Sequence, residues 1–190
     1  NSAQVNIDTI SICSFNIQFF GHFKARDNQT LSEILKSYDI VVIQECENPA
    51  FAKDNNYKEW AKNYLWVGDN KNKGVGVFAK SNISLNKLDW TDEFQYHRVK
   101  YFLPCSINNQ FNLIAVWTHK NNSPNFGYIG QFWKYLQINR HLFNHCIILG
   151  DFNSNSIWDQ WDRWWNHSDI IKELSKMKIS SLYHNFFNQN

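Results

Sequence analysis

The sequence has almost no excess of charge of either sign, and this limits what its surface indicates about binding. Nineteen Lys and Arg face seventeen Asp and Glu in 190 residues, which leaves a formal net charge of +2. So small a charge does not by itself indicate a nucleic-acid partner. Apolar side chains make up 43% of the chain and aromatic side chains 17%, so we expect one folded domain over residues 1–190 with a substantial core.

Long apolar runs and cysteine motifs are also missing. No stretch is apolar enough over a sufficient length to cross a bilayer, so we expect no membrane span. Cys13, Cys46, Cys105 and Cys146 have neither a CxxC spacing nor that of a zinc site. We interpret them as buried reduced thiols, which favours a cytoplasmic location, although a signal peptide already removed would leave no trace. No feature identifies a protein partner.

Four apolar runs each lead into polar side chains at their carboxyl ends. The runs cover residues 9–15, 39–43, 111–117 and 146–149, and the side chains that follow them include Asn16, Glu45, His119, Asp151 and Asn153. Continuous apolar runs predict strands that are buried on both faces. Because an unpaired buried carboxylate is costly, we expect these groups where the strands leave the core, lining one cleft along a sheet edge. The alternative is that each residue only caps its own strand.

Further elements are predicted between and after these runs. Residues 30–33 have the form of a capping box, residues 128–142 have apolar side chains at helical spacing, and Ser168 is placed to cap a later helix. Residues 73–80 and 100–107 are predicted strands, which gives an α+β order.

Three local signals favour structural interpretations. Residues 74–79 match the loose GxGxxA pattern of dinucleotide sites, but they lie within a predicted strand instead of opening a helix. Four tryptophans in the segment 158–165 are either a platform for base stacking or a loop packed by its own aromatics, and we favour the loop. Lys71 with Lys73, and His97 with Arg98, are interpreted as solvated surface, although either pair is able to approach a phosphate.

The residue types at the strand ends suit the hydrolysis of a phosphate ester. Glu45 and Asp151 are hard oxygen ligands without a thiolate or second histidine beside them, which favours Mg²⁺ or Mn²⁺ over zinc. Asn16 and Asn153 add neutral polar groups that hold a phosphate without repelling it. His119 is a donor for charge that develops on phosphoryl oxygens.

Several motifs together resemble one superfamily. Residues 14–18 (Ser-Phe-Asn-Ile-Gln), 43–45 (Ile-Gln-Glu), 118–119 (Thr-His) and 150–154 (Gly-Asp-Phe-Asn-Ser) resemble, in order, the signatures of the endonuclease/exonuclease/phosphatase (DNase I-like) superfamily. Residues 73–78 resemble its inner strand after the metal-binding Glu. Residues 64–70 and 164–169 resemble a bacterial branch of it. The most specific of these motifs is the one at residues 150–154.

The resemblance implies a fold and a role for each site residue. The fold is a four-layer α/β sandwich, with two mixed sheets packed face to face and helices outside. Glu45 is then the principal metal ligand, and Asn16 lies beside the metal and the substrate. Asp151 orients or deprotonates the attacking water, Asn153 holds the scissile phosphate, and His119 stabilises its developing charge.

The chain departs from the superfamily pattern after Asp169. An Ile-Asp-Tyr-like strand and a closing Ser-Asp-His do not occur, and the chain ends at Asn190 after Ser181-Leu182-Tyr183-His184. We therefore expect that the C-terminal part of the domain is missing here and that the natural protein continues past residue 190.

The resulting prediction is a Mg²⁺-dependent phosphoesterase, with Mn²⁺ as an alternative metal, that cleaves phosphodiester bonds in DNA or RNA. Two alternatives stay open. One is a phosphatase of small phosphorylated or lipid substrates. The other is a non-catalytic member that binds a phosphorylated ligand and lacks the terminal Asp-His pair.

Overall fold

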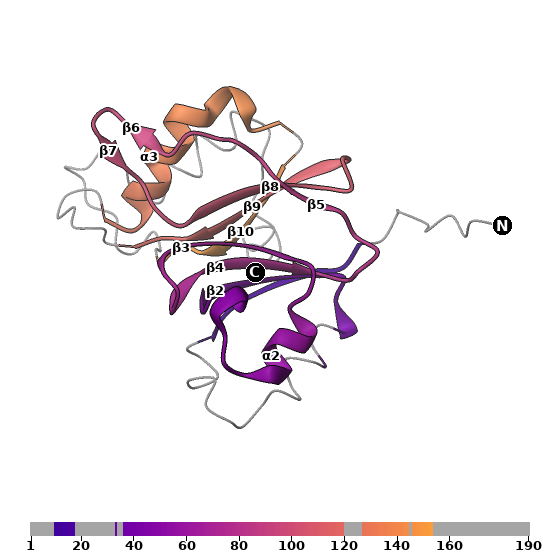
Figure 1. Cartoon of the computed structure of the whole chain (residues 1–190). Helices are drawn as coiled ribbons and strands as arrows, with labels where there is room; N and C mark the ends of the chain where they lie inside the picture. Colours follow the sequence, from indigo (N-terminus) through magenta and orange to yellow (C-terminus); the bar gives the residue numbers. More distant parts are fainter. Residues whose placement is uncertain (1–9, 18–32, 34–35, 120–126, 145, 154–190) are drawn as a thin grey trace, which may run out of the picture. The chain divides into compact units, whose positions relative to one another are not determined.

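A computed structural model describes residues 10–17, 33, 36–119, 127–144 and 146–153, and it is drawn in Figure 1. The chain divides into two compact units. The first comprises residues 1–89, 101–117 and 146–151, and the second comprises residues 90–100, 118–145 and 152–190. No helix in the described ranges has the length and apolar character needed to span a membrane.

Two mixed sheets form the first unit. One has the order β1-β2-β4-β3, from β1 (Ile12–Asn16), β2 (Ile40–Cys46), β4 (Lys73–Ala79) and β3 (Tyr64–Asn70). The other has the order β10-β9-β8-β5, from β10 (Cys146–Asp151), β9 (Phe111–Trp117), β8 (Phe102–Ile107) and β5 (Leu85–Lys87). Each sheet has one parallel pair, β1 with β2 and β10 with β9, and its other pairs are antiparallel.

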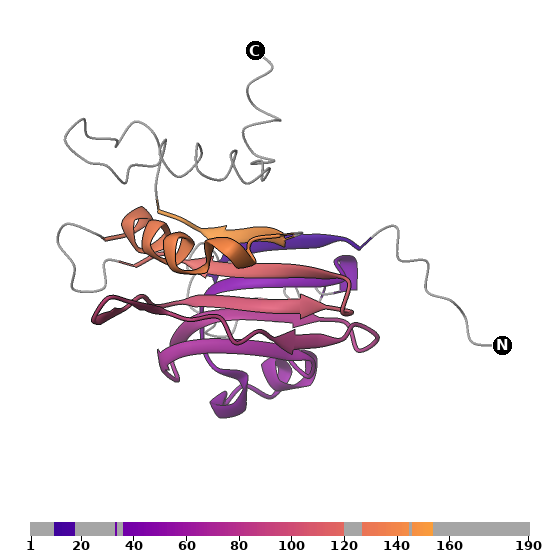
Figure 2. The same ribbon diagram turned by 90° about the horizontal axis from the view of Figure 1, so that it is seen from above.

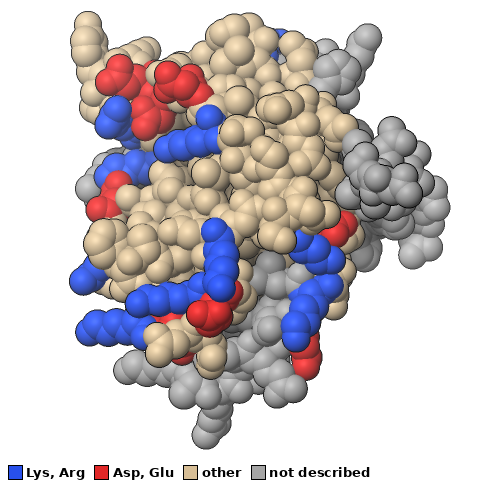
Figure 3. Space-filling view, turned by 45° about the vertical axis from the view of Figure 1, so that its right-hand side comes forward, with Lys and Arg blue, Asp and Glu red and all other residues tan. Residues whose placement is uncertain are grey.

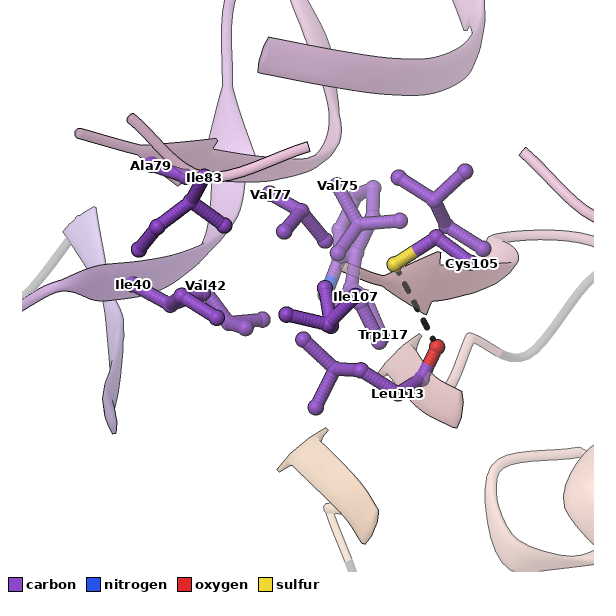
Figure 4. Close-up of a cluster of buried hydrophobic side chains, with 12 residues drawn as sticks. Ile40, Val42, Val75, Val77, Ala79, Ile83, Cys105, Ile107, Leu113 and Trp117 are labelled. Carbon is purple, nitrogen blue, oxygen red and sulfur yellow. Dashed lines mark hydrogen bonds between the residues drawn. The ribbon is translucent and has the colours of Figure 1, made fainter. Parts of the chain in front are cut away.

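The two sheets pack face to face, and the core of the first unit lies between them. Its buried side chains come from both sheets: Ile40, Val42, Val75, Val77, Ala79, Ile83, Leu103, Cys105, Ile107, Leu113, Ala115 and Trp117. The side chains labelled in Figure 4 converge between the strands that carry them. Alternate residues of β2 and β4 supply this face, as the side-chain period of a strand requires. The edge strands β1 and β10 also contact each other across the two sheets, side by side in Figure 2.

A short helical segment covers the outer face of the first sheet. It comprises the 3₁₀ turn η2 (Pro49–Phe51) and helix α2 (Asn55–Trp60). Asp54 caps α2 by accepting a hydrogen bond from the Tyr57 N–H at 3.0 Å. Tyr57 is fully buried against Val41, Ile43 and Phe78, and this packing holds the six-residue helix on the sheet.

The second unit contains a β-hairpin and a longer helix. The hairpin pairs β6 (Glu93–Phe94) with β7 (His97–Arg98), and helix α3 (Ile129–Asn139) continues into the 3₁₀ turn η3 (Arg140–Leu142). Aromatic contacts hold these elements together. The Phe94 and Trp133 ring centroids lie 6.1 Å apart, and those of Trp90 and Phe143 lie 5.1 Å apart.

The predicted fold class is confirmed as an α+β arrangement of two packed mixed sheets with helices. The predicted strands correspond to β1, β2, β4, β8, β9 and β10, and the helix predicted at residues 128–142 is α3 with η3. Strands β3, β5, β6 and β7 and helix α2 were not predicted as elements. The capping box at residues 30–33, the helix after Ser168, the tryptophan-rich segment and the chain end lie largely or wholly outside the described residues. The expectation of a single domain stays a prediction.

The remaining local interpretations agree with the structure where it describes them. All four cysteines are free thiols, with Cys46 and Cys105 buried and the other two half-buried. Burial raises the pKa of Cys46 to about 12, which keeps the thiol protonated and unreactive. The GxGxxA match lies inside β4, where a side chain on Gly74 would collide with the Val67 carbonyl and the Trp66 ring. Close packing, and not nucleotide binding, therefore explains the glycine at position 74.

Gly150 lies close to the backbone of β9. Its φ is 156°, and a Cβ added there would overlap the backbone of Val116. Gly150→Ala therefore forces the two strands apart immediately before Asp151. We expect a loss of about 1–3 kcal/mol in the free energy of unfolding, measured by urea denaturation. Ile147→Ala, at an exposed position of the same strand, is the control and should cost at most about 1 kcal/mol. Equal losses for the two variants would contradict this explanation.

Asp39 fixes the register of β1 on β2. Its carboxylate accepts hydrogen bonds from the Ser11 backbone N–H at 2.9 Å and the Ser11 hydroxyl at 3.2 Å, and it pairs with Lys80 at 3.3 Å. The Ser11 backbone hydrogen bond is the main cause that lowers the pKa of Asp39, with Lys80 adding to it.

A carboxylate with a lowered folded-state pKa stabilises the fold above its unfolded value of about 4, and this contribution is lost as the pH falls through the folded-state pKa. Asp39→Asn should therefore be less stable than the wild type at pH 7. The difference should shrink as the pH is lowered below about 4, as followed by urea denaturation across that range. A difference that stays constant with pH would show that the charge of Asp39 is not involved.

Candidate active site

One amide nitrogen joins two acidic residues at an end of the first unit. Asn16, the last residue of β1, donates from Nδ2 to Glu45 Oε1 at 3.0 Å and to Asp151 Oδ2 at 3.0 Å. Glu45 belongs to β2 in the same sheet, and Asp151 ends β10 in the facing sheet. Because β1 and β10 are the edge strands and lie side by side, their carboxyl ends meet (Figure 2). The three predicted residues of this group are therefore brought together.

A bulge in β2 directs Glu45. The pairing of β2 with β4 shifts between Gln44 and Cys46, and Glu45 has a φ of 59°, in the left-handed region. Such a conformation costs a non-glycine residue energy and is held by its surroundings. Cys46 resumes the strand with its side chain fully buried, and its carbonyl accepts a hydrogen bond from the Trp66 indole N–H at 3.1 Å. The fixed strand residues on both sides hold Glu45 out of the regular ladder.

Lys73 pairs with the second oxygen of Glu45. Its Nζ lies 3.1 Å from Glu45 Oε2, with side-chain exposures of 47% for Lys73 and 14% for Glu45. Lys73 begins β4, which is hydrogen-bonded to β2. Lys73 is exposed, as predicted, and strand pairing also brings it to a candidate site carboxylate, which the sequence did not predict.

An aromatic pair lies next to Asp151 in the second sheet. Trp117 is the Cα partner of Asp151 in the β9–β10 register, and the rings of Trp117 and Tyr101 lie 4.6 Å apart. The Tyr101 hydroxyl donates to Asp69 Oδ2 at 3.1 Å, and Tyr101 has a φ of 67°. Burial, and then the charge of Asp69, raise the pKa of Tyr101 to about 12. Tyr101 and Asp69 were not predicted, because no local pattern distinguishes them.

The two other predicted residues lie in the second unit. Asn153 donates from Nδ2 to the backbone carbonyl of Thr118 at 3.1 Å, and its φ is 45°. His119 directly follows Thr118 in the sequence and is exposed. Its backbone carbonyl accepts a hydrogen bond from the Tyr128 backbone N–H at 3.0 Å. The Asn153 side chain is thus tied to the residue that precedes His119. In the sequence, Asn153 lies two residues after Asp151, and His119 lies two residues after Trp117.

The donors around Asn16 fit a hard divalent cation. The two carboxylates supply oxygen ligands, the kind that Mg²⁺ and Mn²⁺ prefer. Mg²⁺ commonly takes only one or two protein carboxylates and completes its shell with water and phosphate oxygens. Within the described ranges, no three His, Cys, Asp or Glu side chains gather into a preformed metal cage. The Asn16 amide nitrogen faces both carboxylates, so Asn16 acts here as a donor, and its predicted role as a metal ligand would require its oxygen to turn inward.

Solved structures share this fold. The human Nocturnin catalytic domain has a TM-score of 0.59 at 16% identity, over 93% of this chain and 73% of that one. A humanized zebrafish (D. rerio) TDP2 has a TM-score of 0.54 at 14% identity, over 95% of this chain and 73% of that one. The endonuclease domain of TRAS1, a telomere-specific non-LTR retrotransposon, has a TM-score of 0.54 at 13% identity, over 89% and 71%. At such low sequence identity, the structural similarity establishes the fold alone.

The chain thus belongs to the class of proteins in which two mixed sheets form a sandwich with acidic and amide side chains at the strand ends. Within that class, this chain belongs to the Endonuclease/Exonuclease/phosphatase family, whose sequence model matches residues 13–170. The motif-based resemblance to this superfamily is confirmed, and the resemblance of residues 64–70 and 164–169 to a bacterial branch stays a prediction. A search of curated protein sequences finds no match.

Asn16→Ala tests the shared amide. The change leaves the carboxylates of Glu45 and Asp151 without their common donor, so we expect a loss of about 1–3 kcal/mol in the free energy of unfolding in EDTA. Without that donor the two carboxylates repel each other, and dissolved salt screens this repulsion. The loss in the free energy of unfolding should therefore shrink as the NaCl concentration is raised in urea denaturation experiments.

Asn63 provides a matched control, because its Nδ2 also donates to two acceptors, the carbonyls of Lys80 at 2.8 Å and Ile83 at 2.7 Å. Asn63→Ala should cost a similar amount of stability with little dependence on salt. The same salt dependence in both variants would contradict the carboxylate explanation.

Proposed function

We propose that this protein is a Mg²⁺-dependent phosphodiesterase that hydrolyses phosphodiester bonds of DNA or RNA. The observation that carries the proposal is the sharing of the Asn16 amide by Glu45 and Asp151, because it gathers hard oxygen donors at one strand-end position. Membership of a family of endonucleases, exonucleases and phosphatases supports hydrolysis of a phosphate ester.

Each residue has a proposed role. When bound, a divalent cation supplies a Lewis acid that polarises the phosphoryl oxygens. Glu45 would hold that cation, and Asn16 would orient the two carboxylates and lie beside the metal and the substrate. Asp151 accepts a proton from the water that attacks phosphorus, and the leaving oxygen takes a proton from solvent. Asn153 binds the scissile phosphate, and His119 donates a hydrogen bond to the charge that develops on its oxygens.

Nucleic acid is the proposed substrate because of the family and not because of surface charge. The TRAS1 neighbour is an endonuclease domain by name. On the face drawn in Figure 3, Lys and Arg side chains are interspersed with Asp and Glu, and no broad basic surface is visible among the residues described there. The four free thiols support the proposed cytoplasmic location.

The alternatives differ in what they predict for turnover. A phosphatase would release phosphate from small phosphorylated or lipid substrates and leave oligonucleotides intact. A non-catalytic member would bind phosphorylated ligands without turnover of any of them.

A cleavage assay separates these functions. Plasmid, oligonucleotides and small phosphate esters are incubated with the protein in Mg²⁺, in Mn²⁺ and in EDTA. We expect cleavage of the nucleic acids in metal only, and a loss of at least about 100-fold in rate in Glu45→Ala and in Asp151→Asn, comparable to the removal of other catalytic groups.

Asn63→Ala is the control, because it removes a similar side chain away from the site, and it should keep the wild-type rate. Turnover of small esters alone would favour the phosphatase. No turnover of any substrate, in this chain and in one extended past Asn190, would contradict the catalytic proposal.

A further inference from the structure

The Lys73–Glu45 ion pair occupies the carboxylate that the proposed function assigns to the metal. Glu45 has only two carboxylate oxygens, and both already have partners. Oε1 accepts from Asn16 at 3.0 Å, and Oε2 accepts from Lys73 at 3.1 Å. Each oxygen has a further lone pair, but the Lys73 ammonium has a charge of the same sign as a metal ion, so a cation that binds Glu45 competes with Lys73 for this carboxylate.

Lys73 is the partner that is able to leave. Asn16 is 8% exposed and its amide is shared with Asp151, so its movement breaks two hydrogen bonds at once. The Lys73 side chain is 47% exposed and has four flexible carbon–carbon bonds, so its ammonium regains water when the pair opens. Its charge is also of the same sign as a metal ion, and two cations at one carboxylate repel each other.

We propose that Lys73 is a displaceable counter-ion of Glu45, which neutralises the carboxylate in the absence of metal and sets the affinity of the site for divalent cations. This inference rests on the proposed function, since it takes Glu45 as the metal ligand. Lys73 is a positioning residue in this scheme and contacts neither the metal nor the water.

The fold supports such an exchange. Glu45 is held in its left-handed conformation by the bulge in β2 and by buried Cys46, so the carboxylate stays in place when its partner changes. Lys73 is the first residue of β4, next to the turn that follows β3, where only its side chain needs to move. Exchange of a lysine for a divalent cation therefore needs no rearrangement of the sheet.

The test is the affinity for Mn²⁺ in the absence of substrate, measured by titration calorimetry or by the EPR signal of free Mn²⁺. Lys73→Met removes the competing ammonium and keeps the unbranched side chain up to the ε position. We expect Mn²⁺ to bind about two- to fivefold more tightly, the factor that corresponds to a partly exposed ion pair. Lys73→Arg keeps the charge and should bind Mn²⁺ no more tightly than the wild type. Lys73→Gln should reproduce the effect of Lys73→Met and replaces it if that variant does not fold.

Lys80 provides a matched control at the opposite end of β4. It pairs with Asp39 at 3.3 Å, and its side-chain exposure of 40% is close to that of Lys73. Lys80→Met removes an ion pair of the same kind, so its Mn²⁺ affinity should equal that of the wild type. The rise in melting temperature on adding Mn²⁺ should likewise be larger for Lys73→Met than for the wild type or Lys80→Met.

The outcomes separate this inference from the proposed function. Equal Mn²⁺ affinity in wild type and Lys73→Met, with binding measurable in both, would overturn the role of Lys73 alone. Weaker binding in Lys73→Met would also overturn it, because Lys73 would then help to build the site. If the wild type binds no Mn²⁺, the metal-dependent function itself fails, and the role of Lys73 fails with it.

Discussion

Two carboxylates from facing sheets share a single amide nitrogen, and the geometry of the candidate site depends on this contact. Asn16 ends an edge strand of one sheet, and Asp151 ends an edge strand of the other. Like charges brought together at the end of a sandwich repel each other unless a donor or a cation lies between them. The amide supplies that donor without adding a charge of its own, which leaves the site able to take up a cation.

The position of this contact follows from the core below it. Apolar side chains of β2, β4, β8 and β9 fill the space between the sheets, so the sheets are held face to face without help from the site. Local features of the backbone then determine where the side chains of the site lie. Ser11 and Asp39 fix the start of the β1–β2 register, the bulge turns Glu45 outward, and Gly150 lets β10 lie close to β9 just before Asp151. Each feature places one of the three side chains.

Charge balance around Glu45 links this architecture to function. Its carboxylate is largely enclosed and carries both a neutral and a cationic partner. A buried or half-buried carboxylate without such partners would be costly. If Glu45 is the metal ligand, as proposed, Lys73 would balance its charge whenever no metal is bound. The stability of the metal-free protein and its affinity for metal would then be opposing properties of one ion pair.

Much of this was predictable from the sequence, and the rest depends on long-range pairing. The apolar runs that became β2, β4, β9 and β10 predict strands, because burial on both faces leaves a continuous apolar pattern. Asn16, Glu45 and Asp151 could be named as candidate site residues from the sequence, because each follows or ends such a run within a family motif. The pairing of Lys73 with Glu45 was not predicted, because the two residues lie 28 positions apart and only the strand order β1-β2-β4-β3 brings them together. Strands β6 and β7 are two residues each, too short for any periodicity to show.

The central claim is that Glu45, Asn16 and Asp151 form the cation site and that Lys73 gives way to the cation. The most direct measurement is a crystal structure of the protein grown with Mn²⁺, with the metal located by its anomalous scattering. The predicted result is an anomalous peak in contact with the Glu45 carboxylate, with the Lys73 ammonium moved away from Oε2. A peak at another position, or a protein that stays free of Mn²⁺ with the Lys73–Glu45 pair intact, would contradict the claim.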